Sequence, residues 1–148
     1  MIRIVLADDH HIIRKELRAL LSYETDFEVV GEASTGSAAI EIAEQLKPDI
    51  LVLDIMMPEM NGLQVAARLA VSCPYTRIVI LSMHNSKAYV HAALHSGAKA
   101  YILKDNTADE LISAIRQVHS GKCYLNSSLP EEISQVPGRD EERKDRDT

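Results

Sequence analysis

Hydrophobic residues gather in five short runs along the chain, and a segment of helical spacing follows each run. All runs except the second are nearly continuous rather than alternating, which is typical of strands covered by helices on both faces. We therefore predict five strands of a parallel sheet, at Ile2–Ala7, Phe27–Ala33, Ile50–Leu53, Arg77–Leu81 and Ala100–Leu103.

The segments between the runs repeat apolar residues every three or four positions, which is typical of a helix with one apolar stripe. Gly97 suits the left-handed conformation that ends many helices, and Gly121 ends the last predicted helix. Thr107, with Glu110 three residues later, predicts a capping box at the start of the last helix. The predicted helices are His11–Ser22, Ser37–Leu46, Leu63–Val71, Lys87–His95 and Thr107 to about Ser120.

Strands that alternate with helices over short connections indicate an α/β fold with right-handed crossovers. The pattern predicts a (βα)5 doubly wound parallel sheet in the flavodoxin-like order 2-1-3-4-5, in which the first and third strands are neighbours. Asp8 and Asp9 follow the first strand, and Asp54 follows the last apolar residue of the third. We expect these carboxylates to converge at the edge where such sheets bind ligands.

The composition is that of an average globular protein, with 46% hydrophobic and 26% charged residues among 148. A net charge of −6 excludes a domain that binds the phosphate backbone of a nucleic acid through an excess of positive charge. Cys73 and Cys123 lack the spacing of metal ligands or of a disulfide framework. No apolar stretch approaches the ~18 residues that span a bilayer, and no secretory signal pattern opens the chain, so we expect a cytoplasmic protein without membrane contact.

The last part of the chain differs in character from the rest. After Leu129 it contains two prolines, one glycine and eleven charged residues, with almost no apolar periodicity. Such a composition cannot bury enough apolar surface to offset the entropy of ordering. We predict one folded domain over residues 1–122 and a charged linker or tail over residues 123–148.

Three carboxylates at one sheet edge need compensation, because two like charges ~4 Å apart repel by about 4 kcal/mol at an effective dielectric constant of ~20. Mg²⁺ would compensate them, with Asp8, Asp9 and Asp54 as candidate ligands. Asp54 is also the candidate nucleophile for a phosphoryl group, with Lys104 as the cation and Ser82 as the hydroxyl donor at neighbouring strand ends. Singly, such residues are more often turn, cap or solvated residues, but their joint placement indicates phosphoryl chemistry.

The segment D-I-M-M-P-E-M-N-G, which begins at Asp54, resembles the phosphoacceptor motif of two-component response regulator receiver domains, including Met57, Pro58 and Gly62. The phrases L-A-D-D-H-H, I-L-S-M-H and A-Y-I-L-K-D are most similar to the NarL/FixJ subfamily of LuxR type. The remaining receiver motifs are the acidic pair, the Ser/Thr position, the aromatic switch position and the lysine, which match Asp8, Asp9, Ser82, Tyr101 and Lys104.

This resemblance implies a phosphoacceptor with self-catalysed phosphorylation and dephosphorylation, rather than an enzyme with a separate substrate. It implies that Asp54 is phosphorylated by a sensor histidine kinase, and that the backbone carbonyl of Met56 joins the three aspartates around Mg²⁺. Ser82 and Tyr101 are then the switch residues. The surface that they change is formed by the fourth helix, the fifth strand and the fifth helix, and includes Tyr89, His91, Tyr101 and Ser113.

The subfamily resemblance also implies transcription control by the intact protein and a homodimer formed on activation. Residues 123–148 would then precede a helix-turn-helix DNA-binding domain. No segment after Gly121 has the apolar periodicity of such a domain, so we expect DNA binding only through an output domain outside this chain.

Two other functions remain open. A metal-dependent phosphatase with an aspartyl nucleophile, as in the haloacid dehalogenase group, needs a second carboxylate two residues after the first, where this chain has Met56. A receiver-shaped interaction module that works without phosphorylation is the second alternative. His10 and His11 could suggest metal binding, but adjacent residues at a helix start point in different directions, so we expect them to be solvated or packed against a loop.

Overall fold

The sheet of this protein is parallel throughout and has the order β2-β1-β3-β4-β5-β6. The computed structural model describes residues 1–125. The strands are β1 (Ile2–Ala7), β2 (Phe27–Ala33), β3 (Ile50–Asp54), β4 (Arg77–Ser82), β5 (Ala100–Leu103) and β6 (Tyr124–Leu125). The predicted order of the first five strands is confirmed, and β6 extends the sheet by one strand.

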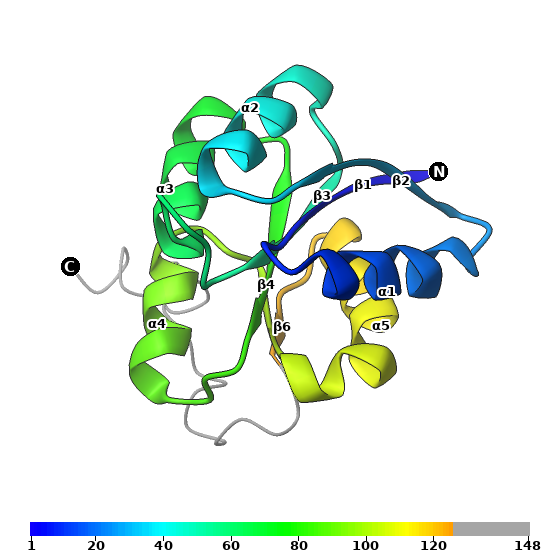
Figure 1. The fold of residues 1–148 in the computed structure, drawn as a ribbon. Helices are drawn as coiled ribbons and strands as arrows, with labels where there is room; N and C mark the ends of the chain where they lie inside the picture. The colour runs from blue at the N-terminus through cyan, green and yellow to red at the C-terminus, as the bar shows by residue number, and fades with distance from the viewer. Residues whose placement is uncertain (126–148) are drawn as a thin grey trace.

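Five α-helices cover the two faces of the sheet. Helices α2, α3 and α4 lie on one face, and α1 and α5 lie on the other (Figure 1). The helices are α1 (His11–Ser22), α2 (Gly36–Leu46), α3 (Gly62–Ser72), α4 (Lys87–His95) and α5 (Thr107–His119), and a short 3-10 turn, η1 (Lys104–Asn106), precedes α5. The result is a three-layer doubly wound fold, as predicted.

The central strand β3 shows why the apolar runs are continuous. All five of its residues are buried, and the side chains of the first four enter a hydrophobic core on one face or the other. Leu51 and Leu53 pack with α2, α3 and α4, whereas Ile50 and Val52 pack with α1 and α5. Alternate residues therefore serve two separate hydrophobic cores, and neither side of the strand remains polar.

Strand β6 is not predicted by the apolar pattern of the sequence. This strand has only two residues, Tyr124 and Leu125, which pair with Ala100 and Tyr101 of β5. Both are half-buried, and the Tyr124 hydroxyl donates a hydrogen bond to Glu110 of α5. Two residues are too few to show a period of two, so contacts with β5 and α5, rather than local pattern, define this strand.

Helix α5 begins at Thr107 as predicted, but its cap differs from the prediction. Asn106, not Thr107, is the residue before the helix, and Thr107 lies inside its first turn. The Thr107 hydroxyl donates to the Lys104 carbonyl at 2.9 Å, and Glu110 accepts from Tyr124. The predicted capping box is therefore wrong, because the 3-10 turn and β6 provide other partners for both side chains.

Residues 126–148 lie outside the described part of the chain. The predicted linker or tail falls almost wholly within that range and stays a prediction. Among residues 1–125, no helix is both long and apolar enough to cross a membrane.

Candidate functional site

Two buried aspartates lie side by side at the carboxyl edge of the sheet. Asp8 follows β1 directly and Asp54 is the last residue of β3, and each is only 1% exposed. The two strands are neighbours, with Ala7 opposite Leu53, so the next position on each strand is one of these aspartates. The predicted convergence of the first and third strands is confirmed for this pair.

The Asp8 residue is held by several groups. Its N–H donates to the Ala33 carbonyl of β2 at 3.1 Å, and its carbonyl accepts from Arg14 Nη1 of α1 at 2.6 Å. Its Oδ1 accepts from the His10 backbone N–H at 2.8 Å. Its Oδ2 is buried and receives no hydrogen bond, although Lys104 Nζ lies 3.3 Å away. One oxygen of a buried carboxylate is therefore open to a further cation.

Lys104 is the cation that the two buried carboxylates share. It lies just after β5, and its Nζ is 3.0 Å from Asp54 Oδ2. Burial and the neighbouring Asp8 raise the pKa of Asp54, and they outweigh the hydrogen bonds from Met56 N–H and Lys104. Burial opposes the charge of Lys104, but its contacts with Asp54 and Asp8 are stronger and raise its pKa. One lysine thus only partly compensates two carboxylates.

The loop after β3 fits closely around Asp54. The Met56 N–H donates to Asp54 Oδ1 at 3.1 Å, while the Met56 side chain points outward and is 55% exposed. Gly62 closes the loop, because its N–H donates to the Ile55 carbonyl at 2.8 Å. A Cβ at Gly62 would lie 2.6 Å from the Asp54 carbonyl oxygen, so only glycine fits this close approach.

Ser82 and Tyr101 lie on the adjacent strands and share the loop after β4. Ser82 ends β4, is fully buried, and accepts a hydrogen bond from the His84 N–H at 2.9 Å. Tyr101 is also fully buried, and its hydroxyl donates to the His84 carbonyl at 2.6 Å. The His84 ring stacks on Tyr89 of α4, with 4.3 Å between ring centroids. These contacts connect the end of β4, β5 and the start of α4.

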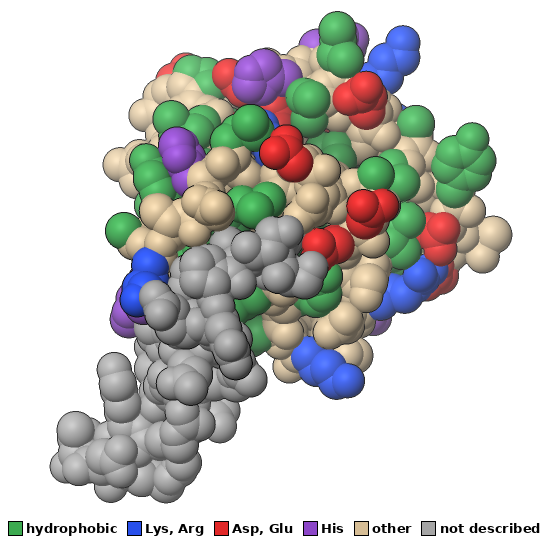
Figure 2. Space-filling model, turned by 90° about the horizontal axis from the view of Figure 1, so that it is seen from below, with side chains coloured by type: hydrophobic (Ala, Val, Ile, Leu, Met, Phe, Trp, Pro, Cys, Tyr) green, Lys and Arg blue, Asp and Glu red, His purple; other side chains and the backbone are tan. Residues whose placement is uncertain are grey.

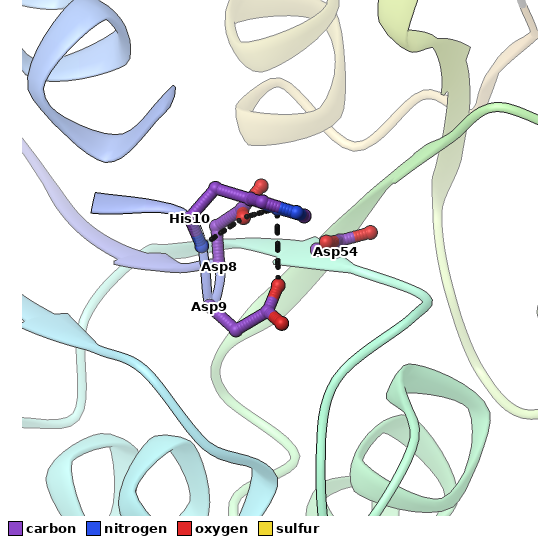
Figure 3. A group of neighbouring side chains, drawn as sticks. All are labelled: Asp8, Asp9, His10 and Asp54. Carbon is purple, nitrogen blue, oxygen red and sulfur yellow. Dashed lines mark hydrogen bonds and ion pairs between the residues drawn. The ribbon is translucent and has the colours of Figure 1, made fainter. Parts of the chain in front are cut away.

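Four side chains offer ligand atoms to one cation. Oxygens of Asp8, Asp9 and Asp54 and a nitrogen of His10 all lie within 4.8 Å of one another. The His10 ring lies beside the first two carboxylates and points toward Asp54 (Figure 3). The open, buried Asp8 Oδ2 and this set of donors fit a divalent cation.

His10 is the residue whose place the sequence analysis did not anticipate. Its side chain is 60% exposed, as a solvated histidine would be, but its Nδ1 contacts both acidic neighbours. Adjacent histidines that diverge still leave one of the two rings free to join the site. The position of His10 directly after two aspartates indicated which of them would do so.

Known proteins are similar to this chain in sequence. The family model of the response regulator receiver domain matches residues 4–116. The transcriptional regulatory protein YhcZ of Bacillus subtilis is 43% identical over 127 residues, which cover 86% of this chain and 59% of YhcZ. The nitrate/nitrite response regulator protein NarL of Escherichia coli strain K12 is 41% identical over 126 residues, covering 85% of this chain and 58% of NarL.

The likeness extends to three dimensions. The solved signal receiver domain of a NarL response regulator from Mycobacterium tuberculosis superposes with a TM-score of 0.79 at 38% identity, covering 82% of this chain and 98% of that one. This chain spans less than two thirds of the length of YhcZ and NarL. From the matched model, these relatives and the shared fold, the chain belongs to the response regulator receiver family and is of the NarL type.

Proposed function

We propose that Asp54 is the phosphoacceptor of this receiver domain and that a sensor histidine kinase supplies the phosphoryl group. A carboxylate oxygen of Asp54 attacks the phosphorus of a phosphohistidine, the P–N bond breaks, and the kinase imidazole keeps the electron pair and takes a proton. The observation that carries this proposal is the pairing of buried Asp54 with Lys104, next to the open Oδ2 of Asp8. The groups that can compensate the charge of a phosphoryl group therefore lie around one acceptor carboxylate.

The proposal gives each residue of the site a defined task. Asp8, Asp9 and Asp54, with the Met56 carbonyl, hold Mg²⁺, which when bound neutralises charge on the transferred phosphoryl oxygens. Lys104, already at 3.0 Å from Asp54 Oδ2, offers a second positive charge to the same oxygens.

Ser82 and Tyr101 form the proposed switch. The Ser82 hydroxyl turns toward a phosphoryl oxygen and draws the loop of His84 with it, so that the hydrogen bond from Tyr101 to the His84 carbonyl has to rearrange. A shift from 1:99 to 99:1 between two states needs about 5.5 kcal/mol. A few hydrogen bonds to a charged phosphoryl group, at about 1.5–3 kcal/mol each, supply that amount. The responding surface comprises α4, β5 and α5, with Tyr89, His91 and Ser113, and Tyr101 is its fully buried switch residue on β5.

The output of the intact protein is proposed to be transcription control in the cytoplasm. The matched relatives are named as a transcriptional regulatory protein and a response regulator, and each is longer than this chain. On the face in Figure 2, acidic and basic side chains are interspersed with hydrophobic ones, and the residues described there form no continuous basic stripe. We therefore assign DNA contact to an output domain that follows residues 123–148, with residues 1–122 as the receiver.

Phosphorylation by acetyl phosphate tests the acceptor directly. With Mg²⁺ present, the wild-type chain is expected to take up one phosphoryl group, measured by intact mass, and Asp54→Asn is expected to take up none. Asp109→Asn, an exposed carboxylate in the first turn of α5, is the matched control and should label normally. Unchanged labelling of Asp54→Asn would refute the assignment, and repeated turnover of a phosphate monoester would favour the phosphatase alternative.

The proposed dimer has its own measurement. Sedimentation velocity before and after acetyl phosphate treatment should show a monomer that associates on phosphorylation. Asp54→Asn should stay at the same sedimentation coefficient under both conditions. If this variant associates to the same extent after acetyl phosphate treatment, dimerisation does not depend on phosphorylation of Asp54.

A further inference from the structure

The His10 imidazole takes a position inside the acidic cluster that the proposed function leaves unused. Its Nδ1 lies 2.9 Å from Asp8 Oδ1 and 3.1 Å from Asp9 Oδ1 (Figure 3). The His10 N–H also donates to Asp8 Oδ1 at 2.8 Å and closes a short turn. This turn brings the residue next to the acids, and the Nδ1 contacts with Asp8 and Asp9 orient the ring.

These distances match the edges of an octahedral coordination sphere. Neighbouring ligands of an ion held at about 2.1 Å lie about 3.0 Å apart. The two contacts of Nδ1 fall on either side of this value, and the ligand atoms of all four residues lie within 4.8 Å of one another. One ion can therefore contact the nitrogen and the carboxylates together after only small side-chain adjustments.

A second observation points independently to a cation at this place. Asp8 is 1% exposed, and its Oδ2 is buried with no hydrogen-bond donor. Lys104 Nζ forms an ion pair with this oxygen at 3.3 Å, but it hydrogen-bonds Asp54, so one lysine is shared by two buried carboxylates. Two buried carboxylates with one shared positive charge keep a net negative charge, which a bound cation would compensate.

We propose that His10 Nδ1 is a direct metal ligand, and that the site consequently selects a borderline first-row divalent cation such as Mn²⁺ or Co²⁺ over Mg²⁺. The inference deepens the proposed metal-dependent phosphoacceptor function and rests on it. With the ring proton on Nε2, Nδ1 offers a lone pair to the ion. Imidazole nitrogen favours first-row transition metals, whereas a site of oxygen ligands alone suits Mg²⁺.

The first experiment measures selectivity on the whole chain. Mg²⁺, Mn²⁺ and Co²⁺ are titrated by calorimetry into the wild type, His10→Ala and His11→Ala. His11, the exposed neighbour at the start of α1, is the matched control. Removal of a true nitrogen ligand should weaken Co²⁺ and Mn²⁺ binding by roughly tenfold or more and Mg²⁺ binding much less, and His11→Ala should leave all three unchanged.

The second experiment detects the nitrogen itself and needs no variant. Electron spin echo envelope modulation of the Mn²⁺-loaded wild type should show coupling to a directly bound ¹⁴N nucleus. Labelling of histidine with ¹⁵N should convert that signal, and His10→Ala should abolish it. This readout is independent of phosphorylation.

Three results would overturn the proposal. They are the absence of nitrogen coupling in Mn²⁺-loaded wild type, persistence of the coupling in His10→Ala, and an equal loss of affinity for all three ions in that variant. Failure of the phosphoacceptor proposal is seen separately, as labelling that survives Asp54→Asn. If the chain shows the nitrogen signal but is not labelled by acetyl phosphate, His10 is a metal ligand and the phosphoryl-transfer proposal is wrong.

Discussion

Two clusters in this molecule each place one cation against two carboxylates, and they differ in burial. At the carboxyl edge of the sheet, Lys104 lies 3.3 Å from Asp8 and 3.0 Å from Asp54, and both carboxylates are 1% exposed. On the surface, Arg116 of α5 lies 2.6 Å from Glu24 and 2.8 Å from Asp26. The ratio of charges is the same in both places.

The two clusters have opposite effects on a carboxylate. Burial and the neighbouring Asp8 raise the pKa of Asp54 in spite of Lys104. At the surface, the hydrogen bond from Arg116 lowers the pKa of Asp26. Water screens the repulsion between exposed carboxylates and leaves the hydrogen bond dominant, whereas burial removes that screening. The same grouping of charges therefore favours the ionised carboxylate at the surface and disfavours it at the buried edge of the sheet.

Removal of Lys104 should give the largest effect. Lys104→Met leaves two buried carboxylates without their cation, so we expect the free energy of unfolding to fall by about 3 kcal/mol in metal-free buffer. A saturating divalent cation should restore part of the loss, because it binds only the folded state. Urea unfolding with and without the metal measures both effects, and Lys99→Met, at an exposed position, is the control. An equal loss in the two variants would contradict the comparison.

Neutralisation of Asp54 should act in the opposite direction. Because the folded-state pKa of Asp54 is raised, protonation of this group favours the folded state. Its stabilising contribution is present at low pH and is lost as the pH rises through the raised pKa. In the presence of a chelator, Asp54→Asn should therefore be more stable than wild type at pH 7, with a difference that shrinks toward pH 4. A difference that does not change with pH would show that charge is not its cause.

Arg14 is as buried as Lys104, which is 16% exposed, but its carboxylate partner Glu32 is 29% exposed, so Arg14 tests intermediate burial of the carboxylate. It is 15% exposed and joins the Asp8 carbonyl to Glu32 of β2. Arg14→Gln removes a charged donor from that carbonyl and should lower the free energy of unfolding by about 1.5 kcal/mol, measured by urea denaturation. Ser22→Ala, which removes an exposed hydroxyl on the same helix, is the control. A fall in the free energy of unfolding as large as that of Lys104→Met would mean that burial of the carboxylates does not determine the size of the effect.

The pH dependence of the Glu32 contacts has the opposite sign to that of Asp54. Burial opposes ionisation of Glu32, but hydrogen bonds from Arg18 and Arg14 outweigh it and lower the pKa below its usual value of 4.5. The stabilising contribution of Glu32 is therefore present above pH 4.5 and is lost as the pH falls through the lowered pKa. Arg14→Gln should weaken this dependence, which urea titrations across that range would measure.

The surface cluster should give the smallest effect. Arg116→Gln removes the contacts with Glu24 and Asp26 and the guanidinium that lies 4.9 Å above the Phe27 ring. Because these charged groups are exposed, we expect only a slight fall in melting temperature, smaller still at high salt, and normal labelling by acetyl phosphate. A loss of labelling would show that this surface cluster affects the site.

The sequence predicted the sheet because strands buried on both faces have an unmistakable pattern. The continuous run of β3 follows from its two cores, and the site carboxylates were located by their position at strand ends. The capping box at Thr107 and the missing β6 show where the pattern is insufficient. In both places the partners, the Lys104 carbonyl and β5, come from the tertiary arrangement.

The amino-acid sequence by itself determined the five main strands, their helices and the residues that meet at the carboxyl edge, because periodicity and strand ends are local properties. Only the tertiary structure decided that the buried Asp8 and Asp54 share one lysine, and that His10 lies against Asp8. Burial and distance depend on residues far apart along the chain. The balance between repulsion and screening, which distinguishes this pocket from the Arg116 cluster, therefore arises only in the folded molecule.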